Sequence, residues 1–259
     1  MPELPDVEVF RRYLEHHARG RRIRDVHVLN PELLDGIDAR RFRERVRGHT
    51  VSGTHRHGKY LFMDLGEDLH VVLHFGMSGH LQKFAPGETP SRHTRVLFDL
   101  DDGALAWVVP RKLARIGLVS SRAELIEAKE LGMDALDKHL DFDTFRRLLT
   151  GRGTLKCALM NQSLIAGIGN IYSDEILFQA RLDPRRSLAS LDEREWRRLY
   201  QSMQQVLKEA ISRGAEPERL PQDWLLRHRR AGQRCGCGGN TVHLNLCGRS
   251  AYYCPACQH

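Results

Sequence analysis

The chain has 259 residues, of which 41% are hydrophobic and 28% are charged, and its mean hydropathy is −0.46. This length suffices for one large domain or two smaller ones, and no apolar stretch approaches the roughly 20 residues that a membrane-spanning helix needs. The N-terminus MPELPDVEVF carries acidic residues where a signal peptide carries basic ones, which argues against secretion and favours the cytosol.

Excess positive charge is concentrated in the C-terminal half. The formal charge is +7, and residues 140–259 contain 18 Lys and Arg against 12 Asp and Glu, whereas the first 139 residues contain 22 against 21. This imbalance is expected if the C-terminal half binds a polyanion, although a well-solvated arginine-rich surface would give the same count.

The first predicted element is a helix over residues 5–18, which has an apolar face and acidic residues in its first turn. From residue 22 to about 121 the pattern changes to short β-rich runs, namely IRDVHVL, YLFMDL, HVVLHF, RVLFDL, ALAWVV and RIGLVSS. Asp101-Asp102-Gly103 between two of these runs predicts a hairpin turn. Many short strands separated by turns indicate a sandwich or a barrel.

Beyond about residue 122 the pattern becomes helical, which places a domain boundary near 122–140. Helices are expected near residues 122–130, 141–149, 155–165 and 171–180. The strongest helical pattern covers residues 190–212, where Ser190 and Glu193 form a candidate capping box and Gly214 a candidate stop.

Four of the six cysteines fall in the last 25 residues, as Cys235-x-Cys237 and Cys254-x-x-Cys257. In a chain without a secretion signal, such clustering indicates a metal site, and four thiolates in two knuckles suit tetrahedral Zn²⁺. A zinc ribbon can serve purely as a structural support. Of the other two cysteines, Cys157 is expected to be a small buried hydrophobe, and Cys247 a spare thiol or a substitute ligand.

Two further segments can carry chemistry. Gly167-Ile168-Gly169-Asn170 lies between two predicted helices, where backbone amides at a helix start can hold a phosphate; an ordinary helix junction has the same pattern.

At the N-terminus, removal of Met1 would leave Pro2 with a free secondary amine. Such an amine can attack a sugar carbon to form an iminium, with Glu3 beside it to transfer protons, although Pro-Glu also merely leads into a helix.

Five segments together carry a family resemblance. They are PELPDVE at the start, GKYLF at 58–62, LHFGMSG at 73–79, AGIGNIYSDE at 166–175 and the terminal cysteine segment. In this order the chain resembles the formamidopyrimidine-DNA glycosylase and endonuclease VIII family across essentially its whole length. The N-terminal motif and AGIGNIY are specific when found together, whereas each alone is weak.

The resemblance implies an α+β fold in three parts. An N-terminal β-sandwich with an N-terminal helix would cover residues 1–130, a helix–two-turn–helix domain residues 131–230, and a zinc finger residues 231–259. It also implies a monomeric DNA-repair enzyme that binds damaged double-stranded DNA. In such an enzyme, Pro2 attacks the sugar C1′, Glu3 acts as general acid and base, and Lys59 binds the phosphate beside the damaged nucleotide.

The remaining implied site residues contact the DNA. Asn170 and Arg249 correspond to residues that bind the flanking phosphates, and Lys156 occupies a lysine position of the family. Met77 matches the residue inserted where the damaged base is flipped out. In PRKLARIG, Arg111 would pair with the orphaned base, and Leu113 would be the apolar wedge where phenylalanine is usual.

Three departures from the family pattern bear on these expectations. The first knuckle is Cys-x-Cys instead of Cys-x-x-Cys, which makes Cys235 the weakest ligand assignment. Asp6 replaces a glutamate, and residues 213–230 look short for the loop that covers oxidised guanine.

Taken with the resemblance, the sequence predicts a glycosylase and AP lyase for oxidised bases that cleaves by β,δ-elimination, with oxidised pyrimidines as the alternative substrate class. A non-catalytic, zinc-stabilised binder of damaged DNA is the alternative from another class.

Overall fold

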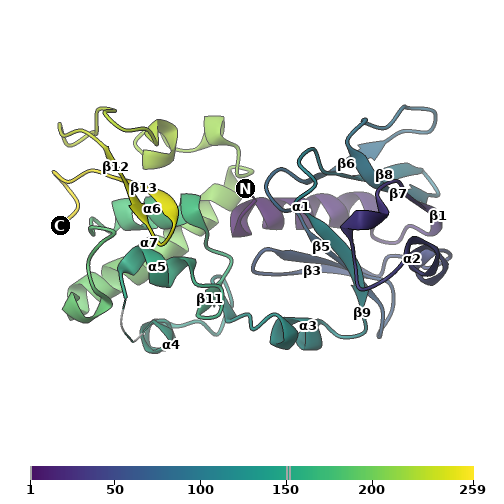
Figure 1. Ribbon diagram of the computed structural model, residues 1–259, viewed down its shortest axis with the longest axis horizontal. Coiled ribbons are helices and arrows are strands. Elements are labelled where there is room, and N and C mark those ends of the chain that lie inside the picture. The colour runs from purple at the N-terminus through teal and green to yellow at the C-terminus, as the bar shows by residue number, and fades with distance from the viewer. Residues whose placement is uncertain (1, 150, 152) are drawn as a thin grey trace. The chain divides into compact units, whose positions relative to one another are not determined.

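The computed structural model describes residues 2–149, 151 and 153–259 (Figure 1). Its contacts divide the chain into two compact units. The first comprises Pro2 and Asp6–Lys129, and the second comprises Glu3–Pro5 and Glu130–His259. Each unit has its own hydrophobic core, and Leu4 belongs to the core of the second. Residues 3–5 therefore pack with the helical part of the chain, although they precede the strands in the sequence.

The first unit contains two β-sheets. In spatial order, the five-stranded sheet consists of β2 (Leu34–Asp35), β9 (Arg115–Val119), β5 (His70–His74), β4 (Tyr60–Asp64) and β3 (Gly53–His57). The four-stranded sheet consists of β1 (Ile23–Val28), β7 (Thr94–Leu100), β8 (Gly103–Val108) and β6 (His80–Phe84). Neighbouring strands are antiparallel, except that β2 and β9 are parallel. The predicted turn at residues 101–102 joins β7 to β8.

The two sheets share one core. Along β7 (TRVLFDL), buried and half-buried residues alternate, so one face of the strand points inward. Val96 and Phe98 from this face lie in the same buried cluster as Leu61 and Val71 of the other sheet. Helix α1 (Leu4–Ala18) adds apolar side chains to that cluster. These contacts confirm the predicted β-sandwich with an N-terminal helix. The unit also contains η1 (Pro31–Leu33), α2 (Ala39–Val46) and α3 (Arg122–Ala128).

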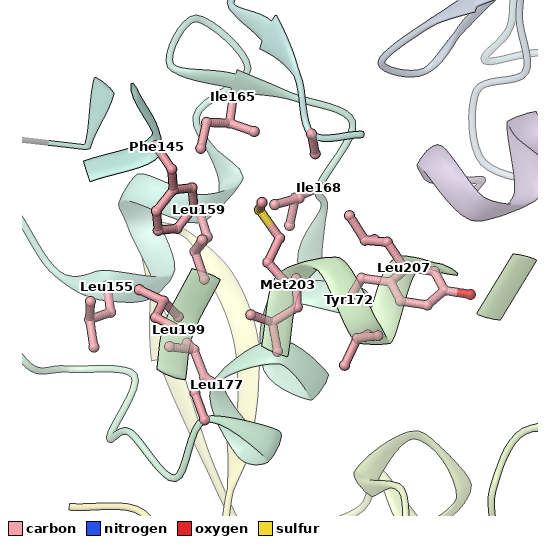
Figure 2. Packing of buried hydrophobic residues seen from close by; sticks show 14 of the residues in the cluster. Phe145, Leu155, Leu159, Ile165, Ile168, Tyr172, Leu177, Leu199, Met203 and Leu207 are labelled. Carbon is pink, nitrogen blue, oxygen red and sulfur yellow. The ribbon is translucent and has the colours of Figure 1, made fainter. Parts of the chain in front are cut away.

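The second unit is mainly helical. Its elements are β10 (Met133–Asp134), α4 (Phe142–Leu148), α5 (Leu155–Met160), β11 (Ile165–Ala166), α6 (Asn170–Gln179), η2 (Leu188–Ser190), α7 (Glu193–Ser212), η3 (Pro217–Arg219) and η4 (Leu225–His228). Figure 2 shows part of its core, in which Phe145, Leu159, Tyr172 and Met203 are packed together. Among the helices in the described part of the chain, none is long and apolar enough to cross a membrane.

The expected capping box at Ser190 and Glu193 is wrong. The helix α7 begins two residues later, where the Asp192 side chain accepts the Glu195 amide and the Glu195 side chain accepts the Asp192 amide. Ser190 instead ends the short helix η2. The predicted stop is confirmed, because Gly214 follows the last turn with φ +73°.

The C-terminal segment forms a β-hairpin. Strands β12 (Val242–Leu246) and β13 (Arg249–Tyr253) are antiparallel, and Leu246 pairs with Arg249 across a two-residue turn. Cys247 and Gly248 in that turn have φ of +52° and +69°, as a type I′ turn requires. The chain end is fastened to the helices, since the buried Gln258 donates to the carbonyl oxygen of Leu182 and accepts from the Cys254 amide.

Candidate functional site

Glu3 is bound by the first turn of α6. Its side chain is fully buried, and its carboxylate accepts the amides of Gly169 (2.8 Å), Ile171 (2.8 Å) and Tyr172 (3.1 Å). These are N–H groups at the positive end of a helix, which stabilise an anion. The amides that the sequence suggested for a phosphate thus hold a carboxylate of the same chain.

The two glycines of the AGIGN segment allow this close approach. A Cβ at Gly169 would lie 2.4 Å from Cδ of Glu3, and a Cβ at Gly167 would lie 2.6 Å from Cδ1 of Leu4. Gly167 also has φ +113°, and its carbonyl oxygen accepts the Leu4 amide at 3.0 Å. The glycine spacing is therefore explained by the passage of residues 3 and 4 against this loop.

Asn170 and Lys156 meet behind the same turn. The Lys156 side chain has no exposed surface, and its Nζ donates to the carbonyl oxygen of Asn170 (3.1 Å), to Ser173 Oγ (2.9 Å) and to Asp174 Oδ1 (2.6 Å). Burial lowers the pKa of Lys156, and the Asp174 carboxylate opposes that shift. Lys156 therefore contacts protein oxygens, whereas the sequence suggested a direct DNA contact.

Asn170 has an unused acceptor. Its Oδ1 is buried, and it has no hydrogen-bond partner among the described residues. Asn170 is the first residue of α6, and its carbonyl oxygen accepts a hydrogen bond from Lys156 Nζ. The start of α6 is thus fixed at its backbone while the amide side chain is left for another group.

Arg249 is exposed at the first position of β13, directly after the hairpin turn. A disulfide joins Cys247 of this turn to Cys157 of α5, with 5.9 Å between the two Cα atoms. The expectations of a buried hydrophobe at Cys157 and a spare thiol or substitute ligand at Cys247 are therefore wrong. The bond fastens the turn directly before Arg249 to the helix that contains Lys156.

The four clustered cysteines form a metal-binding group. The sulfur atoms of Cys235, Cys237, Cys254 and Cys257 all lie within 4.8 Å of one another. Two of the separations are 3.9 Å (Cys235 to Cys257) and 3.5 Å (Cys237 to Cys254). A tetrahedral zinc site with Zn–S bonds of roughly 2.3 Å places its sulfurs about 3.8 Å apart. The set fits such an ion, and it includes Cys235 despite the shortened knuckle.

In the first unit, Lys59 lies in the turn between β3 and β4, next to Gly58 with φ +54°. Its positive charge acts on His74, at the end of β5. Burial, followed by the positive charge of Lys59, lowers the pKa of His74. His74 also contacts Tyr60, with 5.1 Å between the ring centroids. Lys59 therefore lies in the turn of a strand pair, and its charge helps to bias the His74 imidazole toward its neutral form.

Met77 and Leu113 lie on two loops that touch. Their exposed fractions are 40% and 58%, and they are two of the three large hydrophobic residues exposed in the described chain; Leu29 is the third. A Cβ at Gly76 would lie 2.3 Å from the carbonyl oxygen of Leu113, so the loops pack backbone to backbone. Arg111 is exposed on the second loop. The structure thus brings together the predicted wedge residues of unit one.

Pro2 is half-buried and belongs to the first unit, directly before the anchored Glu3. Removal of Met1, on which its free amine depends, concerns a residue outside the described part of the chain. The two residues that follow Pro2, Glu3 and Leu4, are both fully buried and hydrogen-bonded to the loop before α6.

Comparison with known proteins agrees with this geometry. Residues 1–116 match the formamidopyrimidine-DNA glycosylase N-terminal domain, and residues 131–220 match the formamidopyrimidine-DNA glycosylase H2TH domain. A formamidopyrimidine-DNA glycosylase of Desulfitobacterium hafniense (strain Y51) is 35% identical, with 100% of both chains aligned. The chain belongs to the formamidopyrimidine-DNA glycosylase family. This membership confirms the resemblance and makes the chain a DNA-repair glycosylase.

Other relatives of the family are similar over the same extent. A formamidopyrimidine-DNA glycosylase of Moorella thermoacetica is 37% identical, covering 99% of this chain and 92% of that one. The Lactococcus lactis glycosylase bound non-covalently to DNA with an AP site superposes with a TM-score of 0.89 at 27% identity, covering 99% of each chain. A mutant of the same protein with DNA containing Fapy-dG gives a TM-score of 0.89 at 28% identity, covering 100% of each chain.

Two buried acids of this glycosylase were not singled out from the sequence. Asp174 and Glu175 are adjacent in α6, and their exposed fractions are 1% and 0%. Glu175 accepts the Leu226 amide (2.9 Å) and Gln179 Nε2 (2.7 Å), and burial raises its pKa to about 7. It thereby ties η4 to α6. The sequence feature that could have pointed to them is an acidic pair inside the apolar run IYSDEILF. A helix with so few polar residues has no solvent-exposed face on which the two carboxylates could lie.

Proposed function

We propose that this glycosylase is bifunctional: it excises an oxidised base through the N-terminal amine of Pro2, and it then cleaves the strand as an AP lyase. The observation that carries the proposal is the anchoring of Glu3. A fully buried carboxylate that accepts three helix amides fixes the chain immediately after Pro2. A nucleophile must be held within a fraction of an ångström of its productive position, and such anchoring supplies that precision.

The chemistry follows from a secondary amine at the chain terminus. After Met1 is removed, the Pro2 nitrogen attacks the sugar C1′, the glycosidic bond breaks, and the base leaves with a proton. Opening of the sugar ring gives an iminium between Pro2 and C1′. This cation accepts the electrons released when the C2′ proton is removed, so the C3′–O bond breaks first (β). Removal of the C4′ proton then sends electrons toward the same conjugated iminium, and the C5′–O bond breaks (δ). Water then hydrolyses the iminium and restores the amine.

Glu3 is the proposed proton carrier in these steps. Its carboxylate lies one residue from the nucleophile, and it can protonate the ring oxygen and later accept a proton during turnover. The three amides that bind its carboxylate hold the side chain in a defined position directly after Pro2 in the chain.

The phosphate contacts are proposed for Lys59, Asn170 and Arg249. Each carries a donor that is suited to a phosphate oxygen; Lys59 lies in the turn between β3 and β4, Asn170 begins α6 and Arg249 begins β13. Lys156 is assigned an indirect role, because its ammonium group donates hydrogen bonds to Asn170, Ser173 and Asp174. Met77 and Leu113, with exposed apolar side chains, would fill the duplex where the base leaves, and Arg111 would pair with the orphaned base.

Zinc is the proposed metal of the four cysteines, with a structural role in presenting Arg249 from the hairpin. The proposed division is a sandwich domain over 1–130, a helix–two-turn–helix domain over 131–230 and a zinc finger over 231–259. The proposed ligand is damaged double-stranded DNA, as in the Lactococcus lactis complexes with AP-site and Fapy-dG DNA. The proposed substrate class is formamidopyrimidine-type purines, and oxidised pyrimidines are the other arm of the test.

Borohydride trapping tests the mechanism. The wild-type chain should become covalently linked to duplexes that contain an abasic site, a formamidopyrimidine or an oxidised pyrimidine, in proportion to its substrate preference. Pro2→Gly keeps an amine without the ring, so trapping should fall by at least tenfold. A preparation that retains Met1 has an amide nitrogen at Pro2, with its lone pair delocalised, and should bind DNA without cutting it.

The matched control is Pro5→Gly, which makes the same substitution three residues later, within α1. Its trapping per folded chain should equal that of wild type. Trapping and cleavage at wild-type rates by a verified Met1-retaining chain would place the nucleophile elsewhere, with Lys59 the first candidate. Binding without trapping in every preparation would instead favour a non-catalytic binder of damaged DNA.

A further inference from the structure

A buried charge network connects four segments of the second unit. Asp174 of α6 is 1% exposed, and its Oδ1 accepts from Lys156 Nζ of α5 at 2.6 Å. Its Oδ2 accepts from Arg229 Nε at 2.8 Å, directly after η4, and from the Tyr252 amide of β13 at 3.1 Å. One carboxylate therefore receives donors from three elements besides its own.

The two cations of the network also hold the backbone of the proposed phosphate contacts. Lys156 Nζ and Arg229 Nη2 both donate to the carbonyl oxygen of Asn170, at 3.1 and 3.4 Å. Arg229 Nη2 donates further to the carbonyl oxygen of Ser250, at 3.2 Å, which directly follows Arg249. The Arg229 guanidinium is also stacked over the ring of Tyr252, at 4.7 Å. Asn170 and the strand that bears Arg249 thus share one support.

Stability alone is a weak reason for such a network. Buried ion pairs are often no more stabilising than well-packed apolar side chains, because desolvation offsets their attraction. Two cations share this one carboxylate, and the charge of the buried Glu3 also acts on Lys156. What the network does supply is geometry: charge-assisted hydrogen bonds are short and directional, and here they fix α6 against β13.

We propose that Asp174 is a positioning residue that couples Asn170 and Arg249, so that the two bind DNA phosphates as one clamp. If one contact is lost, the other loses most of its effect, because the remaining side chain no longer meets the backbone phosphates in register. The coupling rests on the proposed function, in that both residues must contact DNA. It makes Asp174 essential to tight binding, although no part of Asp174 needs to touch the nucleic acid.

A double-mutant cycle on the zinc-loaded full chain tests this proposal. The dissociation constant is measured for a duplex with a tetrahydrofuran abasic analogue, using Asn170→Ala, Arg249→Ala and the double variant. Each single change should weaken binding by about tenfold, and the double variant should be weaker than either single variant by less than threefold. In an Asp174→Asn background, the fold-losses in affinity caused by Asn170→Ala and by Arg249→Ala should instead multiply in the double variant, as they do for independent contacts.

Two controls separate positioning from simple loss of stability. Leu199→Ala opens a cavity in the core of the same unit without touching the network, and it should leave the coupling intact at matched folded fraction. Asp174→Asn combined with Lys156→Met removes one charge of each sign, and it keeps the test available if Asp174→Asn alone folds poorly. Cleavage of abasic DNA should show KM raised with kcat nearly unchanged in Asp174→Asn, because phosphate contacts are made equally in the ground and transition states.

The failures of the two proposals look different. If neither Asn170→Ala nor Arg249→Ala weakens binding, the phosphate assignment itself is wrong. If both weaken binding and their coupling survives in Asp174→Asn, the clamp exists but Asp174 does not create it. An equal loss of coupling in Leu199→Ala would likewise overturn the positioning role and leave only a structural one.

Discussion

The two units hold residues of the proposed site in opposite ways. In the first unit, Met77 and Leu113 are 40% and 58% exposed on adjoining turns. In the second, Glu3 and Lys156 have no exposed surface, and between them their side chains make six hydrogen bonds to α6 and to Gly169 directly before it. A wedge that enters a duplex must be exposed before it binds. A group that moves protons or aligns phosphates works best when it is already fixed.

The largest effect is expected from a methyl group placed against Glu3. Gly169→Ala puts a Cβ 2.4 Å from the Glu3 carboxyl carbon, which the three amides prevent from moving aside. Base excision and cleavage at a pre-formed abasic site should both fall by roughly 10² to 10⁴, the range that general acid–base catalysis contributes. Single-turnover rates on the two substrates measure this loss.

Gly53→Ala is the matched control for that variant. A Cβ there meets nothing closer than Asp64 Oδ2 at 3.5 Å, an ordinary contact, in the first unit. Its rates should stay within about twofold of wild type. If Gly169→Ala kept wild-type rates on abasic DNA, the anchoring of Glu3 would have no catalytic meaning, and the contrast between the units would be one of packing only.

Removing the metal should disable only the second unit. Metal analysis should find one zinc per chain, and chelation should unfold the hairpin that presents Arg249 and reduce DNA affinity by about 100-fold or more. Hydrogen exchange should then rise in β12 and β13 and stay unchanged in β5. Chelator saturated with zinc beforehand is the control. Full activity in a chain with well under one zinc would refute the assignment.

A smaller and more selective effect is expected in the first unit. Met77→Ala and Arg111→Ala should slow excision from duplex DNA by roughly 10- to 100-fold, because unstacking a base costs a few kcal/mol that the inserted side chains offset. Cleavage at a pre-formed abasic site should change by less than about threefold, since no base must leave the stack. Leu29→Ala, at another exposed apolar residue (56%), should affect neither reaction. Equal losses on both substrates would assign these loops to binding in general.

The smallest effect concerns pH. The folded pKa of Glu175 is about 7 against an ordinary 4.5, so between these values the folded chain holds a proton that the unfolded chain releases. This contribution to stability is therefore complete below pH 4.5 and is lost as the pH rises through 7, by about 1–3 kcal/mol. Glu175→Gln should flatten the decline in urea-unfolding free energy between pH 4.5 and 7. Glu218→Gln, at an exposed site, should leave the decline as it is.

Much of the fold could be predicted because its signals are local. β-Branched runs gave six strands, and cysteine spacing gave the metal group that the structure assembles. Helix α2 was missed because ARRFRERV has only two large apolar residues, Phe42 and Val46, among its arginines. The start of α7 was misplaced because two capping patterns, Ser190 with Glu193 and Asp192 with Glu195, lie two residues apart and are nearly equivalent in propensity.

The parts of the site that were not predicted depend on contacts distant in sequence. Glu3 meets amides about 166 residues away, and Cys157 meets Cys247 across 90 residues. Lys156 carries a side chain that is usually solvated, and only the packing of α5 against Asp174 shows that its ammonium is enclosed. Sequence patterns locate such residues within an element, but they do not say which distant group will meet them.

The disulfide and the four free cysteines of the second unit require opposite redox conditions during purification. Reductants that keep the four clustered thiols available to a metal also cleave the Cys157–Cys247 bond by thiol exchange. Oxidants that preserve this bond convert exposed thiols such as Cys237 to sulfenic acids or mixed disulfides. Protein purified with and without dithiothreitol is therefore two covalent species, which differ in whether the turn before Arg249 is tethered to α5. Affinities from the two preparations should be compared only after free thiols and bound metal have been counted in each.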